Sequence, residues 1–132
     1  HLRMPKVNLN KKILNKIDFY PFKSTGSKLA MTAHILYSSI DSKNVSTFSS
    51  KVINEIIRKK IGFKGIIMSD DISMKALKYD LITNAKKSLA AGCNLVLYCA
   101  GNTKDNFKLI NSVPYIDKFT SKKTSEIYKI LR

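Results

Sequence analysis

The chain has 132 residues, a hydrophobic fraction of 44% and a formal net charge of +15. This length corresponds to one domain or part of one; the sequence holds no run of about 20 apolar residues that would span a membrane, and no recognisable signal peptide. The positive charge is almost all lysine, scattered along the chain without the arginine forks and interleaved aromatics that nucleic-acid binders favour. We interpret it as a solvated surface, with a basic nucleic-acid-binding α/β module as an alternative.

The predicted secondary structure begins with a helix over about residues 10–17, which stops before Pro21. Three short apolar runs, at residues 29–35, 65–69 and 94–100, then predict β-strands. Each run is continuous rather than alternating, which is typical of strands covered on both faces in a parallel sheet. The first residue is His1 rather than Met, so we expect a processed chain or an excerpt.

Helices are predicted between and after these strands. A helix is predicted over residues 47–61, with Ser46 or Thr47 as its cap and Gly62 at its end. Its apolar side chains fall on one stripe, at Val52, Ile53, Ile56 and Ile57. Further helices are expected over residues 81–91, closed by Gly92, over residues 106–112, and from about residue 121. Strand starts recur about every 30 residues, which is the length of a βα unit. The sequence therefore predicts a single α/β domain with a parallel sheet.

Two adjacent acids, Asp70 and Asp71, follow the second predicted strand directly. The carboxyl ends of parallel strands are where α/β folds keep their chemistry, so Asp70 could hold a metal, act as a base or attack as a nucleophile. In the alternative interpretation, one acid only caps a helix that begins near Ser73. His34 ends the first strand and is expected at the same edge. Asp41, in the next loop, either lines this edge or makes a turn.

The two cysteines, Cys93 and Cys99, lie near opposite ends of the third apolar run. In a strand they would be about 20 Å apart, too far for a disulfide. We expect two buried thiols in a reducing compartment, which favours the cytoplasm. No His and Cys cluster has zinc-site spacing. Met74, Tyr98 and Cys99 are expected to serve in packing.

The stretch around the paired acids resembles a known signature. Arg58 followed by Gly62-Phe63-Lys64-Gly65-Ile66-Ile67-Met68-Ser69-Asp70-Asp71-Ile72-Ser73-Met74 is similar to the nucleophile motif of glycoside hydrolase family 3, and more narrowly to bacterial β-N-acetylhexosaminidases of cell-wall recycling. Matches in the same order and spacing are Met31-Thr32-Ala33-His34, Tyr37, Ile40-Asp41 and Ala91-Gly92-Cys93-Asn94-Leu95-Val96-Leu97. The opening His1-Leu2-Arg3-Met4-Pro5 resembles the end of another family motif.

The resemblance implies a TIM (β/α)8 barrel of which residues 1–132 form the C-terminal half, with strands six to eight. It makes Asp70 the nucleophile of a retaining glycosidase and His1 the general acid/base. It puts Met74 near the acetamido group of the sugar and His34 at the barrel mouth, and it makes His34, Met74 and Asp71 the substrate-binding residues. A histidine acid/base fits this chain, which has no second carboxylate at a strand end.

The activity implied by the resemblance is hydrolysis of terminal β-linked N-acetylglucosamine from muropeptide or oligosaccharide fragments in the cytoplasm, without metal or cofactor. An N-terminal half-barrel would be a partner of this chain. Two features depart from the family pattern. No Asp precedes His1, and Asn94 stands where relatives usually carry Asp. An inactive truncated or split-gene fragment is therefore the main alternative.

Overall fold

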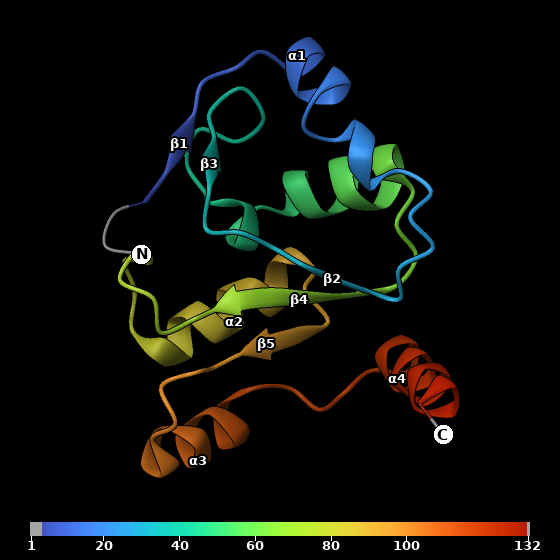
Figure 1. Ribbon diagram of the computed structural model, residues 1–132. Coiled ribbons are helices and arrows are strands. Elements are labelled where there is room, and N and C mark those ends of the chain that lie inside the picture. Colours follow the sequence, from blue (N-terminus) through green and yellow to red (C-terminus); the bar gives the residue numbers. More distant parts are fainter. Residues whose placement is uncertain (1–3, 132) are drawn as a thin grey trace.

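A computed structural model describes residues 4–131. Its centre is a three-stranded parallel sheet in the order β2 (Leu29–Met31), β4 (Ile66–Asp71) and β5 (Leu95–Leu97) (Figure 1). The predicted class, α/β with a parallel sheet, is confirmed. A second parallel ladder, which the sequence analysis did not predict, joins β1 (Lys6–Val7) to β3 (Leu36–Tyr37). With two residues each, these strands carry no apolar run that a pattern search could detect.

Helices lie between the strands of the central sheet in the predicted order. The helices are α1 (Lys11–Lys16), η1 (Tyr20–Phe22), η2 (Ser46–Phe48), η3 (Lys51–Ile61), α2 (Leu81–Ala91), α3 (Thr103–Ser112) and α4 (Lys118–Ile130). Helix α2 has the predicted bounds, because Asp80 accepts the Thr83 N–H at its start and Gly92 ends it with a left-handed φ of 116°. Within residues 4–131, no helix combines the length and apolarity needed to cross a membrane.

The first predicted strand is wrong in its length. Strand β2 ends at Met31, and the chain leaves the sheet before β3 begins at Leu36. Two buried polar side chains lie in between, where an apolar strand was expected: Thr32 is 5% exposed and His34 is 3% exposed. Both contact the hydroxyl of Thr47, which draws this segment toward the following loop.

The helix predicted over residues 47–61 begins later than expected. Ser46 and Thr47 lie in the one-turn 3₁₀-helix η2, and their hydroxyls contact Ile35 O and His34 rather than capping a helix. Ser49 Oγ instead accepts the Val52 N–H, and η3 follows as a π-helix. Gly62, with a φ of 81°, ends it as predicted.

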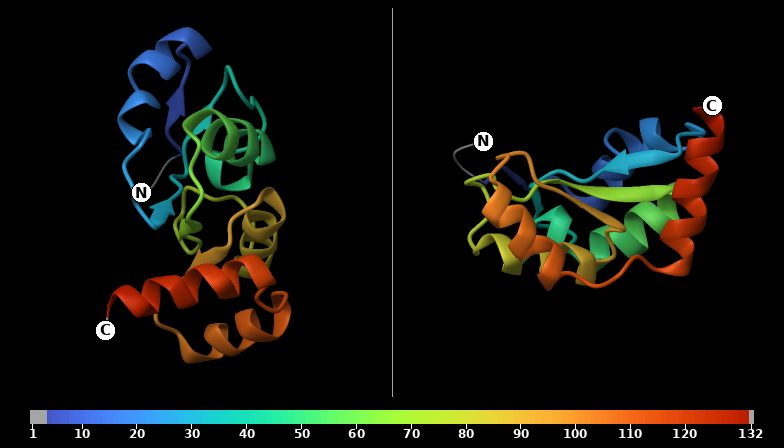
Figure 2. Two further views of the ribbon diagram at one scale, coloured as in Figure 1. Left: turned by 90° about the vertical axis from the view of Figure 1, so that its right-hand side faces the viewer. Right: turned by 90° about the horizontal axis from the view of Figure 1, so that it is seen from below.

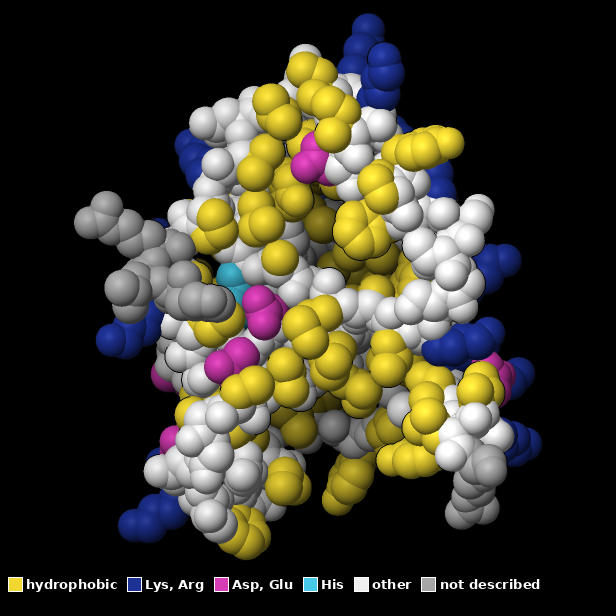
Figure 3. Space-filling view, in the orientation of Figure 1, with side chains coloured by type: hydrophobic (Ala, Val, Ile, Leu, Met, Phe, Trp, Pro, Cys, Tyr) yellow, Lys and Arg dark blue, Asp and Glu magenta, His cyan; other side chains and the backbone are white. Residues whose placement is uncertain are grey.

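Helices pack against one face of the sheet. Helices η3, α2 and α3 lie on the same side of the strands, and α4 crosses their N-terminal end (Figure 2). Ile67 of β4 points to this side, where it is fully buried against Ile53, Ala91 and Cys93. The opposite face is largely open. It is the face seen in Figure 3, where apolar side chains dominate and lysines lie around the rim.

The prediction that both faces of each strand are covered is therefore wrong for β2. Its side chains Leu29 and Met31 are 45% and 52% exposed. They pair in register with Ile66 and Met68 of β4, so all four side chains point to the same face. On β4 this face is better covered, because Ile66 is fully buried and Met68 is partly buried. The molecule has one packed layer of helices and an apolar sheet surface without a matching layer.

Candidate active site

Asp70 lies near the C-terminal end of β4 and is partly exposed. Its Oδ1 accepts the N–H of Asp71 at 2.8 Å, which is the one hydrogen bond to this carboxylate within residues 4–131. An ionised carboxylate has about four acceptor positions, so most of its capacity is free for a ligand. The side chain is thus available for chemistry, while its role as nucleophile stays a prediction.

The carboxylate of Asp71, the second acid, accepts hydrogen bonds from neighbouring segments of the chain. Its Oδ1 accepts the N–H of Ser73 at 3.0 Å and the N–H of Cys99 at 3.1 Å, and the Ser73 hydroxyl binds both of its carboxylate oxygens. Partial burial alone would raise its pKa, but the bonds from Ser73 and Cys99 and the nearby His34 outweigh that effect and hold the pKa of Asp71 below its ordinary value. Asp71 therefore ties the end of β4 to the segment after β5.

The expected helix near Ser73 is absent from the described structure. Residues 72–77 form turns, and the next helix is α2 at Leu81. The hypothesis that one acid only tethers backbone amides therefore applies to Asp71, in a turn, and not to Asp70. The prediction that Asp71 contacts substrate stays open, although its Oδ1 already accepts three hydrogen bonds.

A β-bulge separates the two acids from the regular part of the sheet. The register between β4 and β5 shifts by one residue between the pairs Met68–Leu95 and Asp71–Leu97. The Ser69 hydroxyl, fully buried, accepts the Leu97 N–H at 3.0 Å across this shift. Bulges of this kind redirect side chains near functional sites. Nothing in the sequence marks this role of Ser69, because a serine before two acids gives no signal of a bulge.

His34 lies within reach of the same strand end, as predicted. Its Nε2 is 2.9 Å from Asp71 O and its Nδ1 is 2.8 Å from Thr47 Oγ1. A sugar hydroxyl could bind either nitrogen only if one of these bonds broke. Thr47 was predicted only as a helix cap, and its hydrogen bond to this imidazole was not predicted.

The other predicted site residues have simpler surroundings. Met74 is partly buried in the turn after β4, and its N–H donates to Asp71 O at 3.2 Å. Asp41 makes a turn, because its carboxylate accepts the N–H groups of Lys43 and Asn44 and the hydroxyl of Ser49. Burial acts to raise its pKa, but these bonds, with Ser49 the strongest, lower the pKa to about 2. His1 lies outside the described residues.

The two cysteines differ, contrary to expectation. Cys93 is buried, as predicted, but Cys99 is exposed because β5 ends at Leu97. Within residues 4–131, no three His, Cys, Asp or Glu side chains gather closely enough to hold a metal ion.

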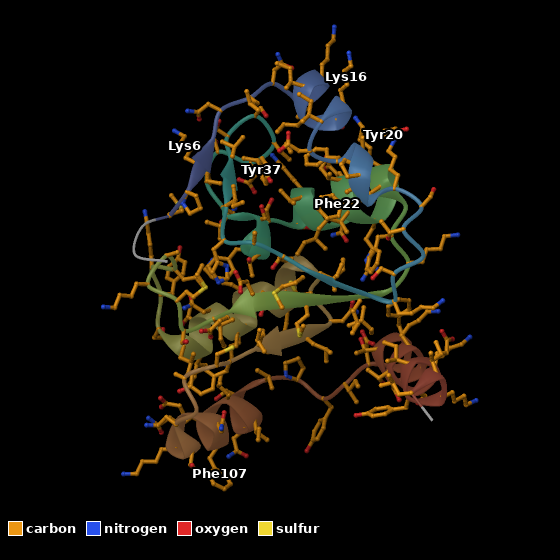
Figure 4. The ribbon with its side chains drawn as sticks, viewed as in Figure 1. Lys6, Lys16, Tyr20, Phe22, Tyr37 and Phe107 are labelled. Atoms are coloured by element: carbon orange, nitrogen blue, oxygen red, sulfur yellow. The ribbon has the colours of Figure 1, made fainter. Side chains whose placement is uncertain are left out.

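Three hollows lie elsewhere in the described structure, and Asp70 lines none of them. Two are near the N-terminal ends of the strands, with volumes of about 250 and 610 Å³. The third, of about 450 Å³, follows the outer edge of β2 and is mostly apolar. Phe22 of η1 and Tyr37 of β3 both line it, whereas Phe107 of α3 points away from the sheet (Figure 4). We call this third hollow the β2 groove.

Comparison with known proteins supplies the family. The profile of the glycosyl hydrolase family 3 N-terminal domain matches residues 1–126. The chain belongs to glycoside hydrolase family 3. This result agrees with the resemblance carried by the signature around Asp70.

Several relatives within family 3 are similar over most of this chain. A β-hexosaminidase of Nitrosomonas eutropha is 44% identical over 91 residues, covering 65% of this chain and 26% of that protein. A β-hexosaminidase of Actinobacillus succinogenes is 34% identical over 128 residues, covering 89% of this chain and 37% of that protein. This chain thus spans between a quarter and two fifths of such relatives.

Solved structures agree with the fold. NagZ from Neisseria gonorrhoeae, in complex with N-trifluoroacetyl-D-glucosamine, superposes with a TM-score of 0.80 at 27% identity, covering 93% of this chain and 37% of that one. CbsA from Thermotoga neapolitana gives 0.77 at 26% identity, covering 98% of this chain and 32% of that one. The sheet and its helices therefore have the arrangement of a family 3 segment.

Proposed function

We propose that this chain carries the nucleophile-bearing part of a family 3 β-N-acetylhexosaminidase, with Asp70 as the nucleophile. Its substrates are terminal β-linked N-acetylglucosamine residues of oligosaccharides, muropeptides among them, and its place of action is the cytoplasm. The observation that supports this most directly is the contrast between the two acids. Asp71 is occupied by its own backbone, while Asp70 accepts a single bond at the carboxyl end of a parallel strand.

The chemistry follows from that carboxylate. An Asp70 oxygen attacks the anomeric carbon while the bond from that carbon to the leaving-group oxygen breaks, and a general acid protonates the leaving oxygen. Water, deprotonated by the same group, then attacks the anomeric carbon and releases Asp70, so configuration is retained. His1, by resemblance, is the acid and base, and Met74 contacts the acetamido group. Neither step requires a metal.

A complete site needs more protein than this chain. We propose that residues 1–132 form strands six to eight of a (β/α)8 barrel, whose remaining strands cover the open face of the sheet. The exposed Leu29 and Met31 on that face and the apolar β2 groove support this arrangement. Barrel interiors are filled by side chains of opposite strands, which is the layer that this sheet surface lacks.

The test is covalent labelling of the complete protein that carries this chain. A fluorosugar inactivator that keeps the 2-acetamido group should leave one sugar on Asp70, located by peptide mass spectrometry, and Asp70→Asn should abolish it. Asp71→Asn serves as the matched control and should still be labelled. A sugar found on another residue would refute the assignment of Asp70.

An inactive or split-gene fragment is the second candidate, because the chain spans only 26% and 37% of the two β-hexosaminidases compared above. Under either reading the isolated chain should not hydrolyse an aryl N-acetylglucosaminide. Labelling decides between them, since a remnant leaves Asp70 unmodified in the complete protein as well. The nucleic-acid alternative predicts salt-sensitive binding to a DNA oligomer at micromolar concentration.

A further inference from the structure

We propose that His34 is a positioning residue that fixes the end of β4, and thereby the direction of the Asp70 carboxylate, by donating a hydrogen bond to the backbone of Asp71. This inference rests on the proposed function, in which Asp70 is the nucleophile. It gives His34 a task that does not require contact with the sugar.

The direction of each hydrogen bond follows from the chemistry of its partners. Asp71 O is a carbonyl oxygen and only accepts, so His34 Nε2 carries the proton of the bond measured at 2.9 Å. In the neutral imidazole, Nδ1 is then an acceptor. The Thr47 hydroxyl has one proton and two acceptors within reach, His34 Nδ1 at 2.8 Å and Ala33 O at 3.3 Å, and it donates to the nearer one, Nδ1. The Thr32 hydroxyl, 2.9 Å from Thr47 Oγ1, donates to that oxygen in turn. The chain runs in one direction, from Thr32 through Thr47 and His34 to the end of β4.

The peptide between Asp71 and Ile72 is held from both neighbouring segments. Its carbonyl accepts from His34 on the β2 side, and its N–H donates to Leu97 O of β5 at 2.9 Å. The carbonyl also accepts the Met74 N–H at 3.2 Å, a bond within the same turn. The preceding peptide supplies the Asp71 N–H that binds Asp70 Oδ1 at 2.8 Å. A rotation of the held peptide would therefore move the donor that orients Asp70.

Strand pairing does not hold β4 on the β2 side at this point. Pairing between β2 and β4 ends at Met31 and Met68, and the last ladder bond runs from Thr32 N to Met68 O. Strand β4 continues to Asp71, next to a β-bulge on its other side. Within the described residues, the His34 imidazole is the group that bonds the end of β4 to the β2 segment. Its burial, at 3% exposure, keeps water from competing for the bond.

The first measurement is the tautomer of His34 in the isolated, isotope-labelled chain, by long-range nitrogen–proton correlation NMR. The expected result is a neutral ring with the proton on Nε2 and a bare Nδ1. A ring protonated only on Nδ1 would overturn the proposal, because it could not donate to Asp71 O. This readout does not depend on enzymatic activity, so it stands or fails separately from the assignment of Asp70 as nucleophile.

The second measurement compares two variants in the complete protein. His34→Gln can keep an N–H donor near the position of Nε2, whereas His34→Leu has comparable bulk and no donor. We expect His34→Leu to slow fluorosugar labelling of Asp70 about 100-fold, the effect of a misplacement near 1 Å, with the Kd of the reaction product unchanged. His34→Gln should recover most of that rate.

The control for a general loss of stability is Ile56→Ala. Ile56 is buried in a core cluster that includes neither His34 nor Asp70. This change should lower the melting temperature without changing the labelling rate. Labelling at the parental rate in a folded His34→Leu variant would contradict the proposal, and so would an equal loss in His34→Gln and His34→Leu. If His34→Leu does not fold, the tautomer and the His34→Gln rate still decide the question.

Discussion

The Arg58 guanidinium and the Asn94 side chain meet at the N-terminal end of the sheet, with Nη2 of Arg58 2.8 Å from Oδ1 of Asn94. Arg58 Nη1 also donates to the carbonyl oxygens of Phe63 and Gly65, at 3.1 and 2.7 Å. The same Asn94 oxygen accepts the Ile67 N–H at 2.9 Å. This pair therefore joins helix η3, the turn before β4 and the start of β5, at the end of the sheet opposite to Asp70.

The Asn94 oxygen accepts the bonds from Arg58 and Ile67, whereas the NH2 of the same side chain donates to Thr120 Oγ1 at 3.1 Å. Asn94→Leu leaves Arg58 Nη2 and the Ile67 N–H without an acceptor, which should lower the free energy of unfolding by about 2–4 kcal/mol. Asn94→Asp keeps both acceptor bonds and should stay within about 1 kcal/mol of the parent. Urea unfolding followed by circular dichroism measures the free energy of unfolding of both variants. Equal losses in Asn94→Leu and Asn94→Asp would show that the acceptor oxygen does not cause the loss of stability.

Gly65 lies where a side chain has no room. A Cβ atom there would lie 2.3 Å from Lys28 O, the oxygen that accepts the Ile66 N–H between β2 and β4. We expect Gly65→Ala to destabilise the chain by about 1–3 kcal/mol, because the backbone of β2 must shift. Gly62→Ala is the matched control. Nothing lies within 4 Å of its Cβ, and the cost should be only the strain of a φ of 81°, about 1 kcal/mol. Amide exchange should rise in β2 for Gly65→Ala alone.

The sequence predicts the parts of this fold that depend on local pattern. The ends of α2 and η3 were predicted from Gly92 and Gly62, whose capping roles need only neighbouring residues, whereas the N-cap Asp80 of α2 was not named in advance. The strand predicted over residues 65–69 is β4, but it runs through both acids to Asp71, so its end was placed two residues too early. The length of β2 and the start of η3 were mispredicted, since both depend on the contact between His34 and Thr47, thirteen residues apart. The exposure of one face of the sheet was not predicted, because a continuous apolar run does not show whether both faces of the strand are covered.

Thiol reactivity tests the different environments of the cysteines. Burial raises the pKa of Cys93 to about 12, whereas Cys99 is exposed. A disulfide reagent should therefore modify one thiol in the folded chain and two in urea. Cys99→Ser should leave none reactive in the folded chain. Reaction of both thiols under native conditions would mean that β5 opens readily.

The turn closed by Asp41 should show in acid. Its folded-state pKa of about 2 lies below the value near 3.9 of an unfolded Asp, so its contribution to stability is complete above about pH 4 and is lost as the pH falls toward 2. Carboxyl NMR should give a titration midpoint of about 2 for Asp41. Ser49→Ala removes the strongest of the lowering hydrogen bonds and should move the midpoint upward. A midpoint near 3.9 in the parent chain would contradict the turn geometry.

The open face of the sheet makes a prediction that separates the isolated chain from the complete protein. Leu29 and Met31 are about half exposed here, so Leu29→Gln with Met31→Gln should change the stability of the isolated chain by less than about 0.5 kcal/mol. If further barrel strands cover this face, the same two changes should destabilise the complete protein by about 3 kcal/mol, because two apolar side chains are then buried there.

The matched control for the open face is Ile67→Gln, on the opposite side of β4. Ile67 is fully buried against the helices in the chain as described, so this change should destabilise the isolated chain and the complete protein alike. Chemical unfolding of the parent, the Leu29→Gln/Met31→Gln double variant and Ile67→Gln, each as the isolated chain and in the complete protein, makes the comparison. Equal tolerance of the Leu29 and Met31 changes in the complete protein would mean that this face stays in water, and the barrel arrangement proposed for residues 1–132 would then be wrong.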